Sequence, residues 1–293
     1  MMLMEDILRP IYQERASQPN TLAIVMIEKR NQTSPLTDNL DVALLVIVSE
    51  LNHPLYVKHY EYDDKKASLT VMSKDDVNKS ILLGTNRRMV DWILNGKVLF
   101  DRNEYIAELV ERLRTFPFSE RKLKMGIEFS KLIRRYLEGK VFFESNQLLD
   151  TYNHIVHALH HLARLEVIDR GFYPEVTVWN QVKQIEPQIY KLYKELIEGE
   201  EPLEKRLELL FLASDFLIHS KTEAGAGHIL SIMSERDSWY FHELYQHPEL
   251  QHYSVDLSVL LEFLVEKKYV SIERQQTKGK GVFHRVYFVN KKC

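Results

Sequence analysis

Two groups of side chains have types and spacing that could support chemistry, and the first lies at the start of an apolar segment. Asp38, Asn39 and Asp41 directly precede the apolar run of residues 42–48. In a strand, residues i and i+2 share a face, so Asn39 and Asp41 should point the same way and Asp38 the other way. Oxygen ligands of this kind suit Mg²⁺, which usually binds substrate phosphates as well. The alternative is a turn at Asp38 and Asn39 that Asp41 caps.

The second group is a row of histidines in the middle of the chain. His154, His157 and His161 are spaced i, i+3 and i+7, which places them on one helix face. They could pack and hydrogen-bond at an interface with the first domain, or bind a substrate in a cleft. They could also ligate a transition metal, although one helix rarely offers three good ligands to one ion. Glu128 and Glu144 are both candidates for a general base on position alone.

Two further patterns in the middle of the chain allow either a binding role or a purely structural one. Trp179, Tyr190 and Tyr193 recur at helical spacing and could stack against a ligand ring, although packing between helices is the commoner use of such a stripe. Arg134, Arg135 and Lys140 could meet a phosphate or form part of a solvated basic face.

Composition bounds the class of protein. The chain has 293 residues, of which 45% are hydrophobic and 28% charged, with a net charge of −3. This indicates a globular protein of two or three domains without an overall basic field for nucleic acid. The one cysteine, Cys293, excludes a disulfide framework within the chain and fits a reducing compartment. The N-terminus lacks the pattern of a signal peptide, and the seven-residue run at 42–48 cannot span a bilayer, so we expect a cytoplasmic protein without membrane partners.

The first part of the chain, residues 1–117, reads as a mixed α/β domain. All ten glycines lie at Gly84 or later, which excludes a glycine-rich phosphate loop in the first 83 residues. Apolar, β-branched or alternating runs predict four strands, followed by two helices. The expected elements are a helix at 4–18, strands at 21–28, 42–49, 55–64 and 67–73, and helices at 80–94 and 103–114.

Two further domains follow, which makes the predicted fold class α+β. Residues 118–222 show long helical periods and predict an α-helical bundle with helices near 120–138, 144–170, 175–198 and 202–219. Residues 223–293 predict helices at 227–235, 238–245 and 255–267, then two alternating strands around a turn with Gly279 and Gly281. Three short helices followed by a β-hairpin are typical of a winged helix-turn-helix.

The order of domains, together with the segments NLDVALLVIV and NGKVLFDRNEYIAELVERL, resembles the nucleotidyltransferase superfamily. More closely, the chain resembles bacterial nucleotidyltransferase-like proteins that add a helical substrate-binding domain and a terminal winged helix. In active relatives a Gly-Ser turn follows the first strand and Asp-x-Asp begins the second. The resemblance implies metal binding at Asn39 and Asp41, catalytic roles for Asp41 and Asp38, and nucleotide phosphates near Lys29 and Arg30.

This sequence departs from the catalytic pattern of that family. The turn after the first strand has residues near Glu28 and Lys29 where Gly-Ser would stand, and a glutamate there would repel a triphosphate. Asn39 replaces the first acid of the pair. The strand that should carry a third acid has Ser68 and Thr70. We therefore expect a degenerate nucleotidyltransferase site with Mg²⁺ as its candidate cofactor.

The last 27 residues form a basic hairpin, and an acidic helix precedes them. Eight basic side chains stand against one acid, and Arg274, Lys278, Lys280 and Arg285 form the basic wing that could contact nucleic-acid phosphates. The candidate recognition helix instead exposes acidic and hydroxyl side chains, namely Asp256, Ser258, Glu262 and Glu266. These disfavour base reading and leave DNA contact by the wing, docking of a protein, and packing against the bundle as alternatives.

Two functions follow from these observations. The first is transfer of a nucleoside monophosphate to a small acceptor held by the helical domain, with a nucleotide and a small molecule as ligands. The second is a non-catalytic regulator or adaptor that senses a ligand and uses the winged helix to bind DNA or a protein. The missing glycine of the turn and the missing acids favour the second function. The complete order of three domains is consistent with the first.

Overall fold

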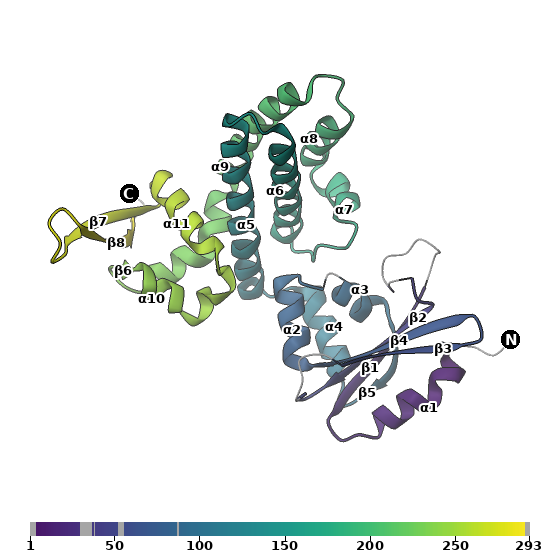
Figure 1. Ribbon diagram of the computed structural model, residues 1–293. Helices are drawn as coiled ribbons and strands as arrows, with labels where there is room; N and C mark the ends of the chain where they lie inside the picture. Colours follow the sequence, from purple (N-terminus) through teal and green to yellow (C-terminus); the bar gives the residue numbers. More distant parts are fainter. Residues whose placement is uncertain (1–3, 30–36, 38, 52–55, 87, 291–293) are drawn as a thin grey trace. The chain divides into compact units, whose positions relative to one another are not determined.

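The computed structural model describes residues 4–29, 37, 39–51, 56–86 and 88–290. The chain forms two compact units, Met1–Pro117 and Phe118–Cys293. The first is a mixed sheet with helices, and the second joins a helical bundle to a winged helix-turn-helix (Figure 1). The predicted α+β class with these three parts is confirmed. Among the described residues, every helix is too short or too polar to span a lipid bilayer.

A five-stranded mixed sheet organises the first unit, in the spatial order β3-β4-β2-β1-β5. Its strands are β1 (Thr21–Glu28), β2 (Val42–Val48), β3 (Tyr56–Tyr62), β4 (Lys65–Ser73) and β5 (Lys97–Asp101). β2 runs antiparallel to β1 and parallel to β4, while β3 and β5 are the edges. β2 is buried along its whole length, which explains its uninterrupted apolar sequence.

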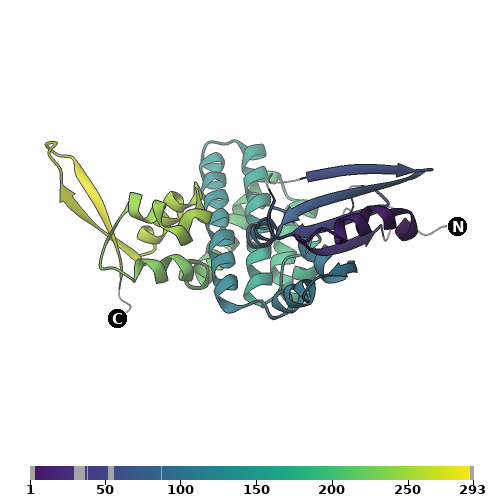
Figure 2. The same cartoon turned by 90° about the horizontal axis from the view of Figure 1, so that it is seen from below.

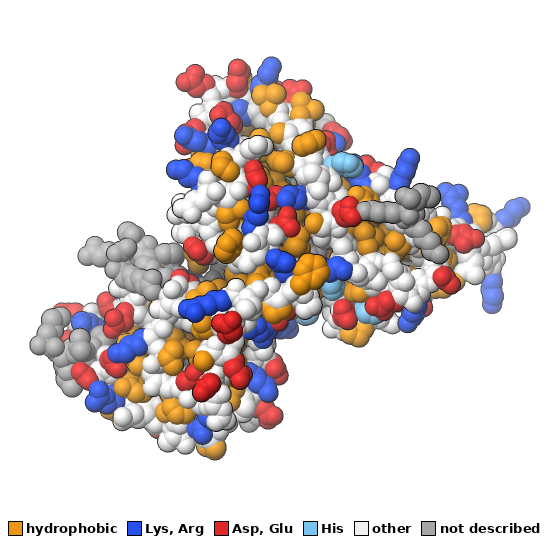
Figure 3. Space-filling view, turned by 180° about the vertical axis from the view of Figure 1, so that it is seen from behind, with side chains coloured by type: hydrophobic (Ala, Val, Ile, Leu, Met, Phe, Trp, Pro, Cys, Tyr) orange, Lys and Arg blue, Asp and Glu red, His pale blue; other side chains and the backbone are white. Residues whose placement is uncertain are grey.

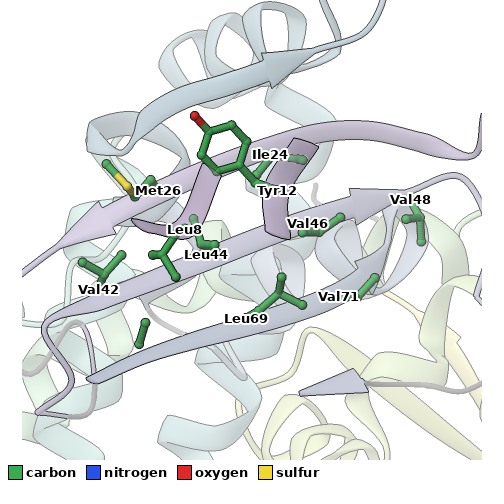
Figure 4. Close-up of a cluster of buried hydrophobic side chains, with 11 residues drawn as sticks. Leu8, Tyr12, Ile24, Met26, Val42, Leu44, Val46, Val48, Leu69 and Val71 are labelled. Carbon is green, nitrogen blue, oxygen red and sulfur yellow. The ribbon is translucent and has the colours of Figure 1, made fainter. Parts of the chain in front are cut away.

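One face of this sheet is covered by α1 (Met4–Ala16). Leu8 and Tyr12 of α1 pack on a cluster of strand residues that includes Ile24, Leu44 and Leu69 (Figure 4). Figure 2 shows the same helix lying across the strands. Alternate residues of β1, β2 and β4 contribute to this cluster, so the intervening residues face the opposite side of the sheet.

Three helices pack on the sheet from that opposite side: α2 (Lys74–Leu83), α3 (Arg88–Asn95) and α4 (Tyr105–Thr115). The prediction of one helix over residues 80–94 is wrong, because α2 starts earlier and ends at Gly84. Gly84 adopts a left-handed conformation, with φ 64°, and this conformation terminates a helix. The strand β5, which pairs with β1, was not predicted.

Long helices build the bundle of the second unit: α5 (Phe118–Glu144), α6 (Leu148–Asp169), α7 (Val178–Ile185), α8 (Pro187–Glu198) and α9 (Leu203–Met233). The helix predicted at 175–198 is two helices, because Glu186 before Pro187 is not helical. The helices predicted at 202–219 and 227–235 are one, α9. A glycine inside α9 is accommodated because Gly225 lets Phe129 approach closely, within 2.4 Å of where a Cβ would stand.

The winged helix-turn-helix continues directly from α9. Its elements are β6 (Trp239–Tyr240), α10 (Phe241–Gln246), a 3-10 helix (Pro248–Tyr253), α11 (Asp256–Glu266), β7 (Val270–Gln276) and β8 (Phe283–Val289). β6, β8 and β7 form a three-stranded sheet. α11 packs against α5, with Phe129 and Phe263 edge to face at 5.9 Å. The bundle and the winged helix therefore share a core.

Candidate functional site

Asp41 joins the ends of three neighbouring strands in the first unit. Its N–H donates to the Lys66 carbonyl at 2.8 Å, and its own carbonyl accepts the Lys29 N–H at 2.8 Å. Its carboxylate Oδ2 also accepts the Lys66 N–H at 2.8 Å. The side chain thus fixes the start of β2 against β4, whereas the alternative offered by the sequence was that Asp41 caps the turn before it.

The residues before Asp41 form a turn. The Leu40 N–H donates to the Thr37 carbonyl at 2.9 Å, and the Thr37 hydroxyl donates to the Leu40 carbonyl at 2.6 Å. Asn39 is exposed and adopts a left-handed backbone, with φ 66°, which asparagine tolerates better than most residues. Asp38 and Arg30, predicted as a catalytic and a phosphate-binding residue, lie outside the described residues.

Glu28 and Lys29 stand where the sequence lacks the Gly-Ser turn, next to the start of β2. Glu28 pairs with Val42, a member of the cluster under α1, so Glu28 belongs to the α1 face. Asp41 precedes β2 in a bend and contacts Lys29 through the backbone, where the Lys29 N–H donates to the Asp41 carbonyl at 2.8 Å. The repulsion of a phosphate by Glu28 stays a prediction.

The described donors at this position do not complete a magnesium centre. They are the Asp41 carboxylate, which already accepts an amide, and the side-chain oxygen of Asn39. On β4 the residue opposite Ala43 is Ser68, so this strand offers a hydroxyl where a third acid would be needed. No group of three His, Cys, Asp or Glu side chains in the described ranges could hold a metal ion. A two-metal phosphoryl-transfer site needs more carboxylates than these.

A second site lies between α5 and α6 in the bundle. His161 Nδ1 is 2.7 Å from the carboxylate of Glu128, a buried residue of α5. His154 Nδ1 is 3.2 Å from the carboxylate of Glu138, also on α5. His157 lies between the other two histidines on α6 and is exposed. The predicted row of histidines is therefore on one face, and that face is turned toward charged residues of α5.

Glu128 is the most strongly perturbed carboxylate of this site. Burial alone would raise its pKa, but the hydrogen bond and charge of His161, with Lys131 and Arg164, lower the pKa to about 2. Lys131 Nζ lies 3.8 Å away and Arg164 Nη1 3.6 Å away. Glu144, the other candidate for a general base, is exposed at the end of α5. Only Glu128 thus lies within the histidine site.

The aromatic stripe forms a compact stack rather than an open platform. Trp179 of α7 and Tyr193 of α8 are parallel, with ring centroids 4.1 Å apart, and His160 meets both edge-on. The Trp179 indole N–H donates to His160 Nε2 at 3.3 Å. Tyr190 instead lies beside Lys183, whose ammonium is 5.5 Å from the ring centroid. The stack joins α6, α7 and α8 and has the character of packing.

The predicted basic wing divides into free and paired cations. Arg274, Lys278 and Lys280 are exposed on the β7–β8 hairpin, and basic side chains gather on this projecting end in the view of Figure 3. Arg285 instead forms an ion pair with Glu262 on α11, with an N–O distance of 2.8 Å. Three of the four predicted wing residues are thus available to a nucleic-acid backbone.

The N-terminus of α11 is occupied by a side chain that the sequence did not predict there. Arg134 of α5 forms an ion pair with Asp256 and donates to the Val255 carbonyl. Asp256 therefore does not project outward as expected, whereas Ser258, Glu262 and Glu266 are exposed. The signal for this contact was missed because 122 residues separate Arg134 from Asp256.

Comparison with known proteins agrees with this architecture. Three family models match in order: nucleotidyltransferase-like over residues 4–121, YgxA-like substrate binding domain over 122–221, and helix-turn-helix domain over 227–289. The protein YgxA of Bacillus subtilis (strain 168) is 63% identical over 288 residues, which are 98% of each chain.

A solved structure shows the same fold. The crystal structure of a nucleotidyltransferase-like protein from Exiguobacterium sibiricum 255-15 is 40% identical and superposes with a TM-score of 0.83. The match covers 98% of this chain and 99% of that one. The chain belongs to the family of nucleotidyltransferase-like proteins that carry a YgxA-like substrate binding domain and a helix-turn-helix domain.

Proposed function

We propose that this protein is a ligand-binding regulator whose nucleotidyltransferase-like domain does not transfer nucleotides. The observation that carries the proposal is the position of Asp41, whose carboxylate accepts the Lys66 N–H at 2.8 Å. A carboxylate used in this way stabilises the start of β2, and no group of three His, Cys, Asp or Glu side chains in the described ranges could hold a metal ion. The domain then has the fold of a transferase with a structural aspartate in the place of a metal ligand.

In this proposal the winged helix contacts nucleic acid through its hairpin. Arg274, Lys278 and Lys280 are exposed and could neutralise phosphates. The outward face of α11 carries Glu262 and Glu266, which lack the donor patterns that read guanine or adenine. Binding should therefore depend on salt far more than on base sequence.

Substitutions at Asp41 test the first half of the proposal. Asp41→Asn keeps a side-chain oxygen for the Lys66 N–H, whereas Asp41→Ala removes it. If Asp41 is structural, Asp41→Asn should unfold near the wild-type temperature and Asp41→Ala at a lower one, since an exposed hydrogen bond of this kind contributes about 0.5–1.5 kcal/mol net. Titration of ATP, GTP, CTP and UTP, with and without Mg²⁺, should then give the same result for wild type and Asp41→Asn. Magnesium-dependent binding that Asp41→Asn abolishes would refute the structural role.

Substitutions in the hairpin test the second half. Lys278→Ala with Lys280→Ala should weaken binding to a mixed-sequence duplex, measured by fluorescence anisotropy over a series of salt concentrations. The slope of log affinity against log salt should fall by roughly 0.9 for each phosphate that the variant no longer neutralises. Lys191 and Lys205 are exposed on α8 and α9, so Lys191→Ala with Lys205→Ala is the matched control. Equal effects of the two pairs would show that the hairpin has no special role.

Nucleotidyl transfer to a small acceptor is a second candidate, and the position of Lys29 favours it. The Lys29 N–H donates to the Asp41 carbonyl at 2.8 Å, so a basic residue is adjacent to the predicted metal ligand. In this candidate Asp41, with Asn39 or Asp38, would hold Mg²⁺, and Lys29 and Arg30 would bind nucleotide phosphates. Pyrophosphate release that requires Mg²⁺ and disappears in Asp41→Asn, with an unchanged unfolding temperature, would support transfer over the regulator.

A further inference from the structure

The facing surfaces of α5 and α6 carry charged side chains in two rows with the same spacing. On α5 the row is Glu128, Lys131, Arg135 and Glu138, and on α6 it is His154, His157, His161 and Arg164. Both rows follow i, i+3, i+7 and i+10, which keeps each on one helix face. The acids occupy only the two ends of the α5 row.

Close contacts between carboxylates and basic side chains at both ends fix how the two rows face each other. At one end, the Glu128 carboxylate contacts His161, Arg164 and Lys131 at 2.7, 3.6 and 3.8 Å. At the other end, the Glu138 carboxylate contacts His154 at 3.2 Å, and Arg134 and Arg135 at 3.5 Å. Each acid is therefore shared among three basic side chains.

The centre of the face carries no acid, and its cations Lys131 and Arg135 share the acids at the two ends. The antiparallel register set by the end pairs places His157 opposite Lys131 and Arg135, between the two carboxylates. His157 is exposed and donates no side-chain hydrogen bond to any residue in the described part of the chain. Its ring nitrogens are therefore available to a ligand.

We infer that this centre, formed by Lys131, Arg135 and His157 and bordered by Arg164, binds the phosphate group of an anionic ligand. The inference deepens the proposed function, because it names the chemical class of the ligand that the helical domain would bind. An ammonium and a guanidinium of α5 face an imidazole of α6 in the register that the end pairs set. A phosphate dianion carries more charge and more acceptor oxygens than a carboxylate, so it can accept from all three.

The electrostatics of His157 agree with an anion at this place. Partial burial lowers its pKa first, and the positive charges of Arg135, His161, His154 and Arg164 lower it further. The neighbouring positive charges therefore disfavour protonation of His157, whereas a bound phosphate dianion would favour it. Glu128 and Glu138 do not reverse the effect, because each is already engaged with several cations.

The test follows the His157 ring by NMR in the full-length protein while inorganic phosphate is added at constant ionic strength. Phosphate should shift the His157 resonances saturably and raise the pKa of His157 by about 1, as expected for an opposite charge in contact. Arg135→Gln should weaken phosphate binding about tenfold, the effect expected for one charge-assisted hydrogen bond. Lys140→Gln is the matched control, because Lys140 lies on α5 near Asp215 and outside the two rows.

Three results would overturn the inference. They are a His157 ring that does not respond to phosphate, an equal response to acetate at the same ionic strength, and equally weakened binding in Arg135→Gln and Lys140→Gln. Because this measurement uses neither DNA nor nucleotide, it is separate from the tests of the proposed function. Phosphate binding at His157 without salt-dependent DNA binding would support the phosphate site and reject the proposed regulator function. Salt-dependent DNA binding without phosphate binding at His157 would reject only the phosphate site.

Discussion

Arg285 on β8 holds Glu262 on α11 in a two-pronged ion pair, with N–O distances of 2.8 and 2.9 Å. The pair ties the hairpin wing to the exposed face of the helix that would enter a DNA groove. It neutralises one wing cation and fixes one acid on the recognition face. The acidic face of α11 is therefore part of the reason that the winged helix should bind nucleic acid weakly.

Removing this acid should strengthen nucleic-acid binding. Glu262→Gln would release Arg285 to contact a phosphate and would remove a charge that repels the DNA backbone. The slope of log affinity against log salt should steepen by roughly 0.9, the value for one added phosphate contact. Fluorescence anisotropy with a mixed-sequence duplex measures it.

Glu266→Gln provides the control for this prediction. Glu266 is also exposed on α11, and its contact is with Lys267 at 4.0 Å rather than with the wing. The Glu266→Gln substitution removes the same charge one turn away without releasing Arg285. Equal slopes for the two variants would mean that net charge alone, and not the freed arginine, sets the affinity.

A glycine in α5 allows the winged helix to pack against the bundle. A Cβ at Gly126 would lie 1.9 Å from the Tyr253 hydroxyl, and Tyr253 is fully buried beside His228, with a hydroxyl–Nδ1 distance of 3.0 Å. Gly126→Ala should therefore lower the free energy of unfolding by about 1–3 kcal/mol through overpacking. Thermal unfolding followed by circular dichroism measures the decrease.

Gly227 supplies the matched substitution. It also lies inside a helix, but a Cβ there would meet only Lys122 Cε at 3.4 Å. Gly227→Ala should stabilise the protein by up to about 1 kcal/mol, the difference in helix propensity between glycine and alanine. If both alanines were stabilising, the Gly126 contact with Tyr253 would not be tight.

The elements that could be predicted from the sequence are those with strong local patterns. The buried strand β2 followed from an unbroken β-branched run, and the hairpin wing followed from alternating residues around Gly279 and Gly281. The missed strand β5 has only five residues, none of them buried, so it shows no clear alternation. α9 was divided in the prediction because a domain boundary was placed between residues 222 and 223, whereas the helix runs through it and Gly225 packs against Phe129.

The contacts of the candidate sites were harder to predict than the elements. The row of histidines was visible as a helix face, but its partner Glu128 lies 33 residues from His161. Only the register between α5 and α6 brings the two together, and that register depends on buried residues of both helices. The pairing of Arg134 with Asp256 depends likewise on the packing of α11 against α5.

The pKa of Glu128 predicts an acid-sensitive contribution to stability. The folded pKa of about 2 is below the ordinary value of 4.5, so the contribution is complete above pH 4.5 and is lost as pH falls toward 2. The shift corresponds to about 3 kcal/mol. Glu128→Gln should destabilise the protein by about this amount at pH 7, and by about half as much at pH 3. Urea unfolding at both pH values measures the difference.

Glu144→Gln is the control for this pH dependence, because Glu144 is exposed at the end of α5. It should leave the free energy of unfolding within about 0.5 kcal/mol of wild type. A Glu128→Gln variant equally destabilised at pH 3 and pH 7 would show that the contribution comes from shape rather than from the charge.

Lys124 should show the opposite dependence on pH. It is buried on α5 next to this same cluster, and burial is the main reason that its pKa falls to about 8 from 10.5, with Lys131 and Arg164 lowering it and Glu128 raising it. Because the folded pKa is depressed, the charged form opposes folding, and stability should rise as pH increases from about 8 to 10.5.

Lys124→Met, which retains the apolar stem, removes this cost of about 3 kcal/mol. It also removes the contact of the ammonium with the Tyr173 ring, which lies 5.6 Å away and offsets the gain by about 0.5–2 kcal/mol. The variant should therefore unfold at a higher temperature than wild type at pH 7, and the difference should disappear near pH 10.5. Lys140→Met, at a half-exposed lysine of the same helix, should show no such convergence. A lower unfolding temperature for Lys124→Met at pH 7 would mean that the contacts of the ammonium outweigh the cost of burying its charge.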